Sequence, residues 1–211
     1  MTSEARLRER GDQHGAPAPA LHDRAADNLR FIRDTMARAG PFTSVSGRGM
    51  VVVGGIGIAA SVASARVGIE HETPTWLAIW FAAAALAATI SWTTIRRKAA
   101  STGQSLSAGP ARRFALAFAP AIVAGAVMTV ALLARGAPSL LPGTWLTLYG
   151  AAVTAGGALS VRPVPVMGAA FVALGAACFF MDAAWQPLVL GAGFGGLHLL
   201  FGYLIARHHG G

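Results

Sequence analysis

The sequence predicts an all-α integral membrane bundle of six transmembrane helices, preceded by a basic amphipathic helix at the membrane interface. Two observations predict it. Apolar residues make up 54% of the 211 residues and charged residues only 12%, whereas soluble domains carry roughly a quarter charged residues. The apolar residues also stand in runs of about 20 without alternation, which is the length of helix that crosses a hydrocarbon core.

The N-terminal part of the chain divides into a tail and a helix. Residues 1–20 are charged and then rich in Ala and Pro, which predicts a disordered cytoplasmic tail. Residues 21–40 are expected to form the amphipathic helix, whose apolar stripe is Leu21, Ala25, Leu29, Ile32 and Met36. Arginines flank this stripe, so we expect the helix to lie on the membrane surface against anionic lipid headgroups, or alternatively to dock a partner.

Residues 41–211 are expected to form the six-helix transmembrane domain. The predicted spans are about 49–69, 75–95, 114–134, 140–161, 164–181 and 187–206. None contains an acidic or basic residue in its interior. Prolines stand at the helix entries, where a missing N–H costs little, except Pro120, which is expected to kink the third span.

The basic residues predict the topology. With both termini in the cytoplasm, only Arg66 and Arg135 of the 17 Lys and Arg residues fall on the outer side, as the positive-inside rule requires. The net charge of +8 therefore indicates lipid contact and topology, and no motif indicates a nucleic-acid partner. Abundant Arg, Ala and Gly predict a bacterial inner membrane. No cleavable leader precedes the first span, which is expected to direct insertion itself.

His198 is the strongest candidate for a functional residue. Apart from the Cys178 thiol it is the only ionisable side chain well inside a span, and such residues are functional hypotheses by default. Gly191, Gly195 and Gly202 share its helix face, and the first two form a G-x-x-x-G pair that lets another helix approach closely. We therefore expect His198 to face protein, where it either bonds another helix or contacts a ligand.

A polar layer is a second hypothesis. Thr89, Thr154 and His198 lie at similar depths on the even-numbered spans, so they would meet if the spans formed three related hairpins. Arg66 followed by Trp76, and Arg135 followed by Trp145, hint at such a repeat. An aromatic belt at the membrane interface explains the same tryptophans more simply.

No cofactor or catalytic set is predicted. Four outer residues could bind a divalent cation if their loops meet, although a solvated loop is the simpler interpretation; they are Glu70, His71, Glu72 and Asp182. A haem held by two histidines would need a second intramembrane His. The glycines of residues 54–57 lack the strand–turn–helix context of a phosphate loop. We expect the protein to bind no metal and no cofactor and to have no enzymatic activity.

Three stretches carry a resemblance: Asn28 to Arg33, Phe42 to Gly47, and Gly193 to His198 with the ending that runs through Arg207 to Gly211. Together they resemble an uncharacterised family of small bacterial multi-pass inner-membrane proteins. The resemblance covers Leu21 to the C-terminus. It implies a shared fold and a bacterial inner membrane, but no activity and no site residues.

The function predicted from these features is non-enzymatic. We expect an accessory, scaffold or assembly component that packs through small residues, either as a homo-oligomer or with another membrane protein. The alternative is a small transporter or channel for a neutral or weakly polar solute, with its polar layer at Thr89, Thr154 and His198. Ion coupling is less favoured because no span contains a carboxylate.

Overall fold

The computed structural model describes residues 18–39, 46–102 and 109–209, and these residues are almost entirely helical, with no strand among them. The chain divides into two compact units, residues 1–40 and 41–211. The predicted disordered tail lies outside the described residues as far as Pro17. The turn predicted at Phe42 to Gly47 is described only from Ser46.

The described part of the first unit is the helix α2 (Ala18–Ala39). It begins slightly before the predicted start at Leu21. Leu29, Ile32 and Met36, which belong to the predicted apolar stripe, are all exposed. An exposed ion pair joins Arg30 to Asp27 at 3.2 Å, and such pairs add little stability in water. Within the described part of this unit, nothing covers Leu29, Ile32 and Met36.

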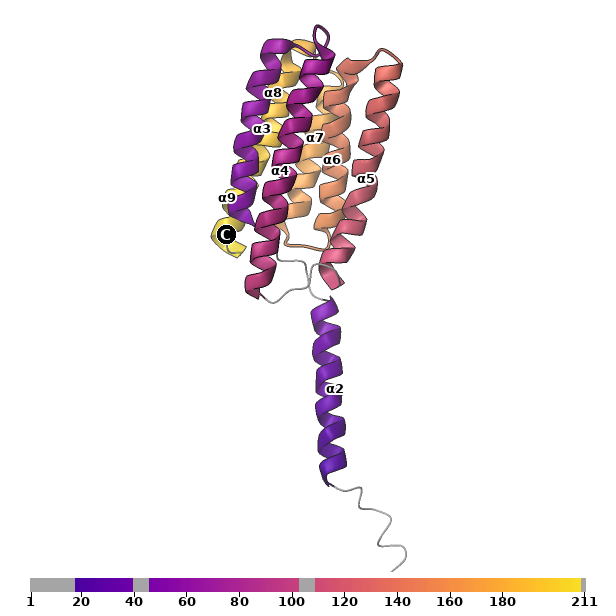
Figure 1. Ribbon diagram of the computed structural model, residues 1–211, viewed down its shortest axis with the longest axis vertical. Coiled ribbons are helices and arrows are strands. Elements are labelled where there is room, and N and C mark those ends of the chain that lie inside the picture. Colours follow the sequence, from indigo (N-terminus) through magenta and orange to yellow (C-terminus); the bar gives the residue numbers. More distant parts are fainter. Residues whose placement is uncertain (1–17, 40–45, 103–108, 210–211) are drawn as a thin grey trace, which may run out of the picture. The chain divides into compact units, whose positions relative to one another are not determined.

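The second unit is a bundle of helices (Figure 1). Its elements are α3 (Gly47–Val67), α4 (Thr73–Thr102), α5 (Gly109–Ala134), η1 (Pro138–Leu140), α6 (Leu141–Gly157), α7 (Pro163–Cys178), η2 (Ala183–Trp185), α8 (Gln186–Leu190), η3 (Gly191–Leu197) and α9 (His198–His209). The last three follow one another without a break, and η3 is a π-helical segment.

Local sequence signals define the helix ends. Ser46 caps α3, because its hydroxyl oxygen accepts a hydrogen bond from the backbone N–H of Gly49 at 3.2 Å. Gly68 ends the same helix with φ of +73°, a backbone conformation that glycine adopts without strain. Prolines occupy the first turns of the later helices, as expected from the sequence; they are Pro74, Pro142, Pro163 and Pro187.

Four helical segments are long and apolar enough to cross a membrane, which fits a membrane protein. They are Gly47–Val67, Thr73–Ser101, Gly109–Ala134 and Ala183–His208. The predicted spans 140–161 and 164–181 are longer than the helices found there, α6 with 17 residues and α7 with 16. A run of apolar residues continues through the turn after Gly157, although the helix ends there.

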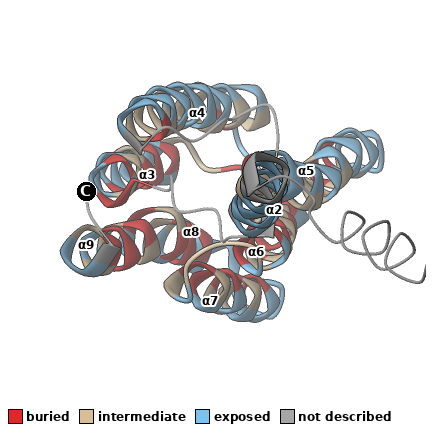
Figure 2. Ribbon diagram, turned by 90° about the horizontal axis from the view of Figure 1, so that it is seen from below, coloured by how far each residue is buried: buried red, intermediate tan, exposed pale blue. Residues whose placement is uncertain are grey.

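Packing divides the second unit into two groups of helices. α6 packs between α5 and α7, while α3 packs against α4, η3 and α9. Figure 2 shows α4 beside α3 on one side of the unit and α5 beside α6 on the other. Phe171, Leu146 and Leu190 are fully buried where α6, α7 and α8 meet. α5 continues as a helix through Pro120.

Candidate functional site

An apolar cleft separates α4 from α5 and α6. α4 packs chiefly against α3, and α5 packs chiefly against α6. No described helix fills the space between α4 and α5, and this space is the cleft. The cleft has a volume of about 500 Å³. Phe81 lines it and is nevertheless 54% exposed, so the cleft opens on the side of the bundle. In a bilayer that side faces lipid.

The two walls differ in side-chain size along the middle of the cleft. There the α4 wall carries small residues at helical spacing, which are Ala83, Ala84, Ala87, Ala88 and Ser91, whereas Trp76, Trp80 and Phe81 line the cleft nearer the start of α4. The opposite wall carries aromatic rings from α5 and α6, which are Phe114, Phe118, Trp145 and Tyr149. Because alanine side chains end at Cβ, the α4 wall leaves room in front of these rings. The space is thus created by the small residues of α4.

The cleft is elongated. Along α4 its lining runs from Trp76 to Ile95, which at 1.5 Å per residue is about 28 Å. A volume of about 500 Å³ distributed over that length suits an extended chain better than a compact solute.

A hydrogen-bonded pair forms the most polar part of the lining. The hydroxyl of Tyr149 lies 2.9 Å from Nε2 of His198, and Nδ1 of His198 lies 3.0 Å from the carbonyl oxygen of Phe194. A carbonyl oxygen only accepts, so Nδ1 carries a proton and donates it. In the neutral ring Nε2 then accepts from the Tyr149 hydroxyl. Both imidazole nitrogens are satisfied, and His198 is only 4% exposed.

The π-helical segment η3 allows this arrangement. The backbone N–H of His198 donates to the carbonyl of Gly195. The Phe194 carbonyl, which a regular α-helix would pair with that N–H, accepts instead from the His198 side chain. π-helical turns of this kind occur often at functional sites. The rings of Tyr149 and Phe171 lie within 5.6 Å of the imidazole, centre to centre, and the ring of Phe194 lies 5.2 Å from that of Tyr149.

The predicted glycine stripe packs inside the chain. A side chain at Gly195 would meet Ile58 of α3, and one at Gly202 would meet Met50 and the backbone of α3. Gly191 lies against Ser61, also of α3. These glycines bring η3 and α9 close to α3, while His198 is directed toward α6. The glycine stripe that suggested association with other proteins is thus already packed against α3 of the same chain.

The predicted polar layer does not form. Thr89 is exposed on α4 and donates its hydroxyl to the carbonyl of Ala85 in its own helix. Thr154 donates to Gly150 in its own helix and packs against Gly168 of α7. His198 bonds Tyr149 instead. The sequence indicated the depth of each residue but not the direction in which its side chain points around the helix axis.

The outer acidic residues do not form a metal site. Among the described residues, no group of three or more His, Cys, Asp or Glu side chains could hold a metal ion. Glu70, His71, Glu72 and Asp182 are all exposed. Exposure keeps these side chains hydrated, so no ligand set gathers at this end of the bundle.

The tryptophans divide between the cleft and the surface. Trp76 is buried and Trp145 half-buried, and both line the cleft with Trp80. The indole N–H of Trp145 donates to Thr129 at 3.0 Å. Trp185 is exposed, as a residue of an aromatic belt would be. Trp76 and Trp145 contribute to the cleft rather than to a belt.

Comparison with known proteins adds no relative: no family model matches the chain, and no curated protein or solved structure is similar to it. The resemblance noted from the sequence therefore stays a prediction. The site must be interpreted from its own geometry.

The cleft and the role of Tyr149 were not predicted from the sequence. A signal was present, since Ala83, Ala87 and Ser91 recur at four-residue spacing on a single span. Such a stripe is normally the contact face for another helix. Only the packing of α4 and α5 against different neighbours shows that this stripe faces a cleft.

Proposed function

We propose that the protein is a six-span, non-enzymatic protein of a bacterial inner membrane that binds one lipophilic molecule with an extended hydrocarbon chain in the α4–α5 cleft. The observation that carries this function is the shape of the cleft, about 28 Å long with a volume of about 500 Å³. Ligand pockets in proteins typically have volumes of about 300–1,000 Å³. An extended chain matches a cleft of this length, whereas a compact solute would occupy only part of it.

The lining supports an apolar occupant. Nearly all of its side chains are aliphatic or aromatic. Its buried polar pair, Tyr149 and His198, is internally hydrogen-bonded. A path for a polar solute would need polar groups along its length, because an unsatisfied polar group is costly in an apolar environment. The cleft thus favours a lipid-like ligand over the neutral or weakly polar solute considered from the sequence.

A scaffold role has less support than ligand binding. The scaffold hypothesis rested mainly on helix faces made of small residues. The small-residue faces of η3 and α9 pack against α3 within the same chain. The remaining small-residue face, on α4, lines the apolar cleft, where an apolar ligand can contact it. Within the proposal, α2 lies on the cytoplasmic membrane surface, where its exposed apolar stripe and its arginines contact lipid.

Filling the cleft is the experiment that tests this function. We expect native mass spectrometry of the gently solubilised protein to show one retained lipid per chain. Ala87→Phe places a ring in the cleft, so the retained fraction should fall by about tenfold, equivalent to ~1.4 kcal/mol of binding free energy. Ala82→Phe is the matched control, because Ala82 is exposed on the same helix and does not line the cleft. Equal retention in both variants would rule out the cleft as the binding site.

The proposed topology is tested separately. With α6 and α7 as the fourth and fifth of six spans, both termini are cytoplasmic, and only Arg66 and Arg135 are external. We expect an alkaline phosphatase fused after Gly211 to be inactive and a green fluorescent protein fused there to be fluorescent. An active phosphatase at that position would show an odd number of spans or an inverted orientation.

A further inference from the structure

The hydrogen bond between Tyr149 and His198 lies in the wall of the cleft, because both residues line it. Nδ1 of His198 donates to the carbonyl of Phe194, so Nε2 of the neutral ring accepts the hydrogen of the Tyr149 hydroxyl. The hydroxyl has a single hydrogen but two lone pairs on its oxygen, and it bonds no second residue in the described part of the chain. Tyr149 therefore presents an open acceptor and no donor.

The other polar side chains of the lining are one serine and three tryptophans. Indole N–H groups only donate, and that of Trp145 already donates to Thr129. Ser91 carries the remaining hydroxyl, on the small-residue wall of α4. Tyr149 and Ser91 are thus the side chains of the lining that can accept a hydrogen bond from a ligand.

Tyr149 lies half-way along its helix. It is eight residues from each end of α6, which at 1.5 Å per residue is about 12 Å. The lining continues past it on α6 in both directions, to Pro142 and to Val153. A ligand that follows the cleft therefore passes Tyr149 part-way along its own length.

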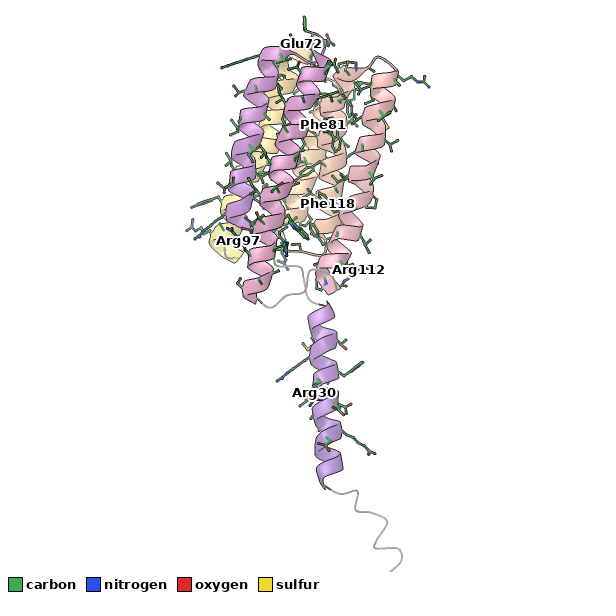
Figure 3. The ribbon with its side chains drawn as sticks, in the orientation of Figure 1. Arg30, Glu72, Phe81, Arg97, Arg112 and Phe118 are labelled. Atoms are coloured by element: carbon green, nitrogen blue, oxygen red, sulfur yellow. The ribbon has the colours of Figure 1, made fainter. Side chains whose placement is uncertain are left out.

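Figure 3 shows the depth of this region, because Phe118 of α5 lies between Phe81 of α4 and the end marked by Arg112. The ring of Phe118 lies 6.1 Å from that of Tyr149, centre to centre. In the proposed topology the lipid headgroups lie at the two ends of the bundle, since a hydrocarbon core is about 30 Å thick. The phosphate of a phospholipid therefore does not reach the Tyr149 hydroxyl.

We propose that the ligand is a neutral lipid with a hydroxyl group part-way along its hydrocarbon chain, and that this hydroxyl donates its hydrogen to the oxygen of Tyr149. This inference rests on the proposed function, because it specifies the class of lipid that the cleft binds. A hydroxyl carried into hydrocarbon loses its hydrogen bonds to water, which is costly unless a protein group replaces them. The Tyr149 oxygen replaces one of them.

His198 is a positioning residue in this proposal. Its Nε2 holds the hydrogen of Tyr149, so the Tyr149 oxygen accepts from the ligand and does not donate to it. The competing explanation is that the pair only joins α6 to η3. In that case a ligand with a donor and a ligand without one would bind equally well.

The test compares two ligands that differ in the hydrogen-bond donor. Heptadecan-9-ol has a hydroxyl at the centre of an unbranched chain, and 9-methoxyheptadecane carries a methyl group in place of the hydroxyl hydrogen. The delipidated protein is equilibrated with equal amounts of both, and native mass spectrometry separates the two complexes. We expect the wild-type chain to retain the alcohol about 3- to 20-fold more than the ether, equivalent to the ~0.6–1.7 kcal/mol of a hydrogen bond between membrane helices.

Two variants change the preference in different ways. Tyr149→Phe with His198→Leu removes the phenolic oxygen and also the imidazole nitrogen that Tyr149→Phe alone would expose. This double variant should lose the preference because it retains less alcohol, while retention of the ether shows that the cleft is still formed. His198→Leu alone frees the hydrogen of Tyr149 to donate to the ether oxygen, so it should reduce the preference by retaining more ether.

Tyr203→Phe is the matched control. Tyr203 is the other tyrosine of the chain, is 56% exposed and does not line the cleft. It should keep the wild-type preference for the alcohol. A loss in Tyr203→Phe equal to that in the double variant would overturn the assignment to Tyr149.

The proposal would also be overturned by equal retention of alcohol and ether in the wild type, or by an unchanged preference in His198→Leu. An unchanged preference in the double variant would overturn it as well and would identify Ser91 as the acceptor. The function of the cleft is judged separately. It stands if both ligands are retained equally and Ala87→Phe lowers the retention of both, and it falls if Ala87→Phe leaves retention unchanged.

Discussion

Gly57→Val is expected to cause the largest loss of stability of any single substitution considered for this chain. Gly57 lies on α3, where a Cβ atom would overlap the backbone carbonyl of Phe194 and lie 2.8 Å from the backbone nitrogen of Gly195. Neither backbone atom can move without shifting η3 as a whole. Overpacking of a tightly packed site typically costs about 1–3 kcal/mol, and a clash with backbone should reach the upper end of that range.

Gly55→Val is the matched control for this prediction. Gly55 lies two residues away on the same helix, and a Cβ atom there would meet nothing within 4 Å. Both variants add the same side chain to α3, so the helix propensity changes equally. We expect thermal unfolding in detergent to show a marked loss for Gly57→Val only. Similar melting temperatures for the two variants would contradict the close contact of α3 with η3.

His198→Leu is expected to have the second-largest effect. Leucine approximates the size of the imidazole but makes no hydrogen bond, so the hydroxyl of Tyr149 and the carbonyl of Phe194 lose their partner. A hydrogen bond between membrane helices contributes about 0.6 kcal/mol on average and up to ~1.7. An unsatisfied buried group adds its own cost. A loss of about 2 kcal/mol is expected in equilibrium unfolding.

The double variant distinguishes a hydrogen bond from simple packing. Tyr149→Phe removes the hydroxyl that His198→Leu leaves without a partner, so the combination should cost less than the sum of the single changes. The difference measures the coupling between the two side chains. Strictly additive losses would mean that the hydroxyl and the imidazole do not interact.

The Gly57→Val and His198→Leu predictions both concern the region where η3 lies between α3 and α6. Gly57 fixes the distance of α3 from η3, and the Phe194 carbonyl that it approaches is the acceptor for His198. Phe194, Tyr149 and His198 all line the cleft. The packing of α3 on η3 therefore helps to shape the wall on which the proposed ligand rests.

Much of the fold could be predicted from the sequence. The long apolar runs overlap the helices α3, α4, α5, α6 and α7 and the continuous stretch α8–η3–α9, because a backbone in an apolar medium must satisfy its own hydrogen bonds. Hydropathy was less accurate at helix ends. The apolar run of residues 140–161 continues beyond Gly157, where α6 stops, since hydropathy records side-chain transfer energy and not where helical hydrogen bonding ends.

The candidate site was only partly accessible from the sequence. His198 was identified as a candidate because it is an ionisable residue in an apolar run. A single segment of the sequence is enough for that inference. Its partner Tyr149 lies 49 residues away, and nothing in the sequence indicated that the two helices turn these side chains toward each other. Thr89 and Thr154 were grouped with His198 by depth, yet each bonds its own helix.

The sequence by itself determined the helical class, the positions of the helices and the basic character of one end, because each depends on the composition of a continuous segment. Only the tertiary structure decided that α4 packs against α3 while α5 packs against α6, and that an apolar cleft therefore lies between α4 and α5. Inside a membrane, apolar faces have nearly equal affinity for lipid and for one another. Which faces meet depends on shape complementarity between distant segments, which no local pattern of residues records.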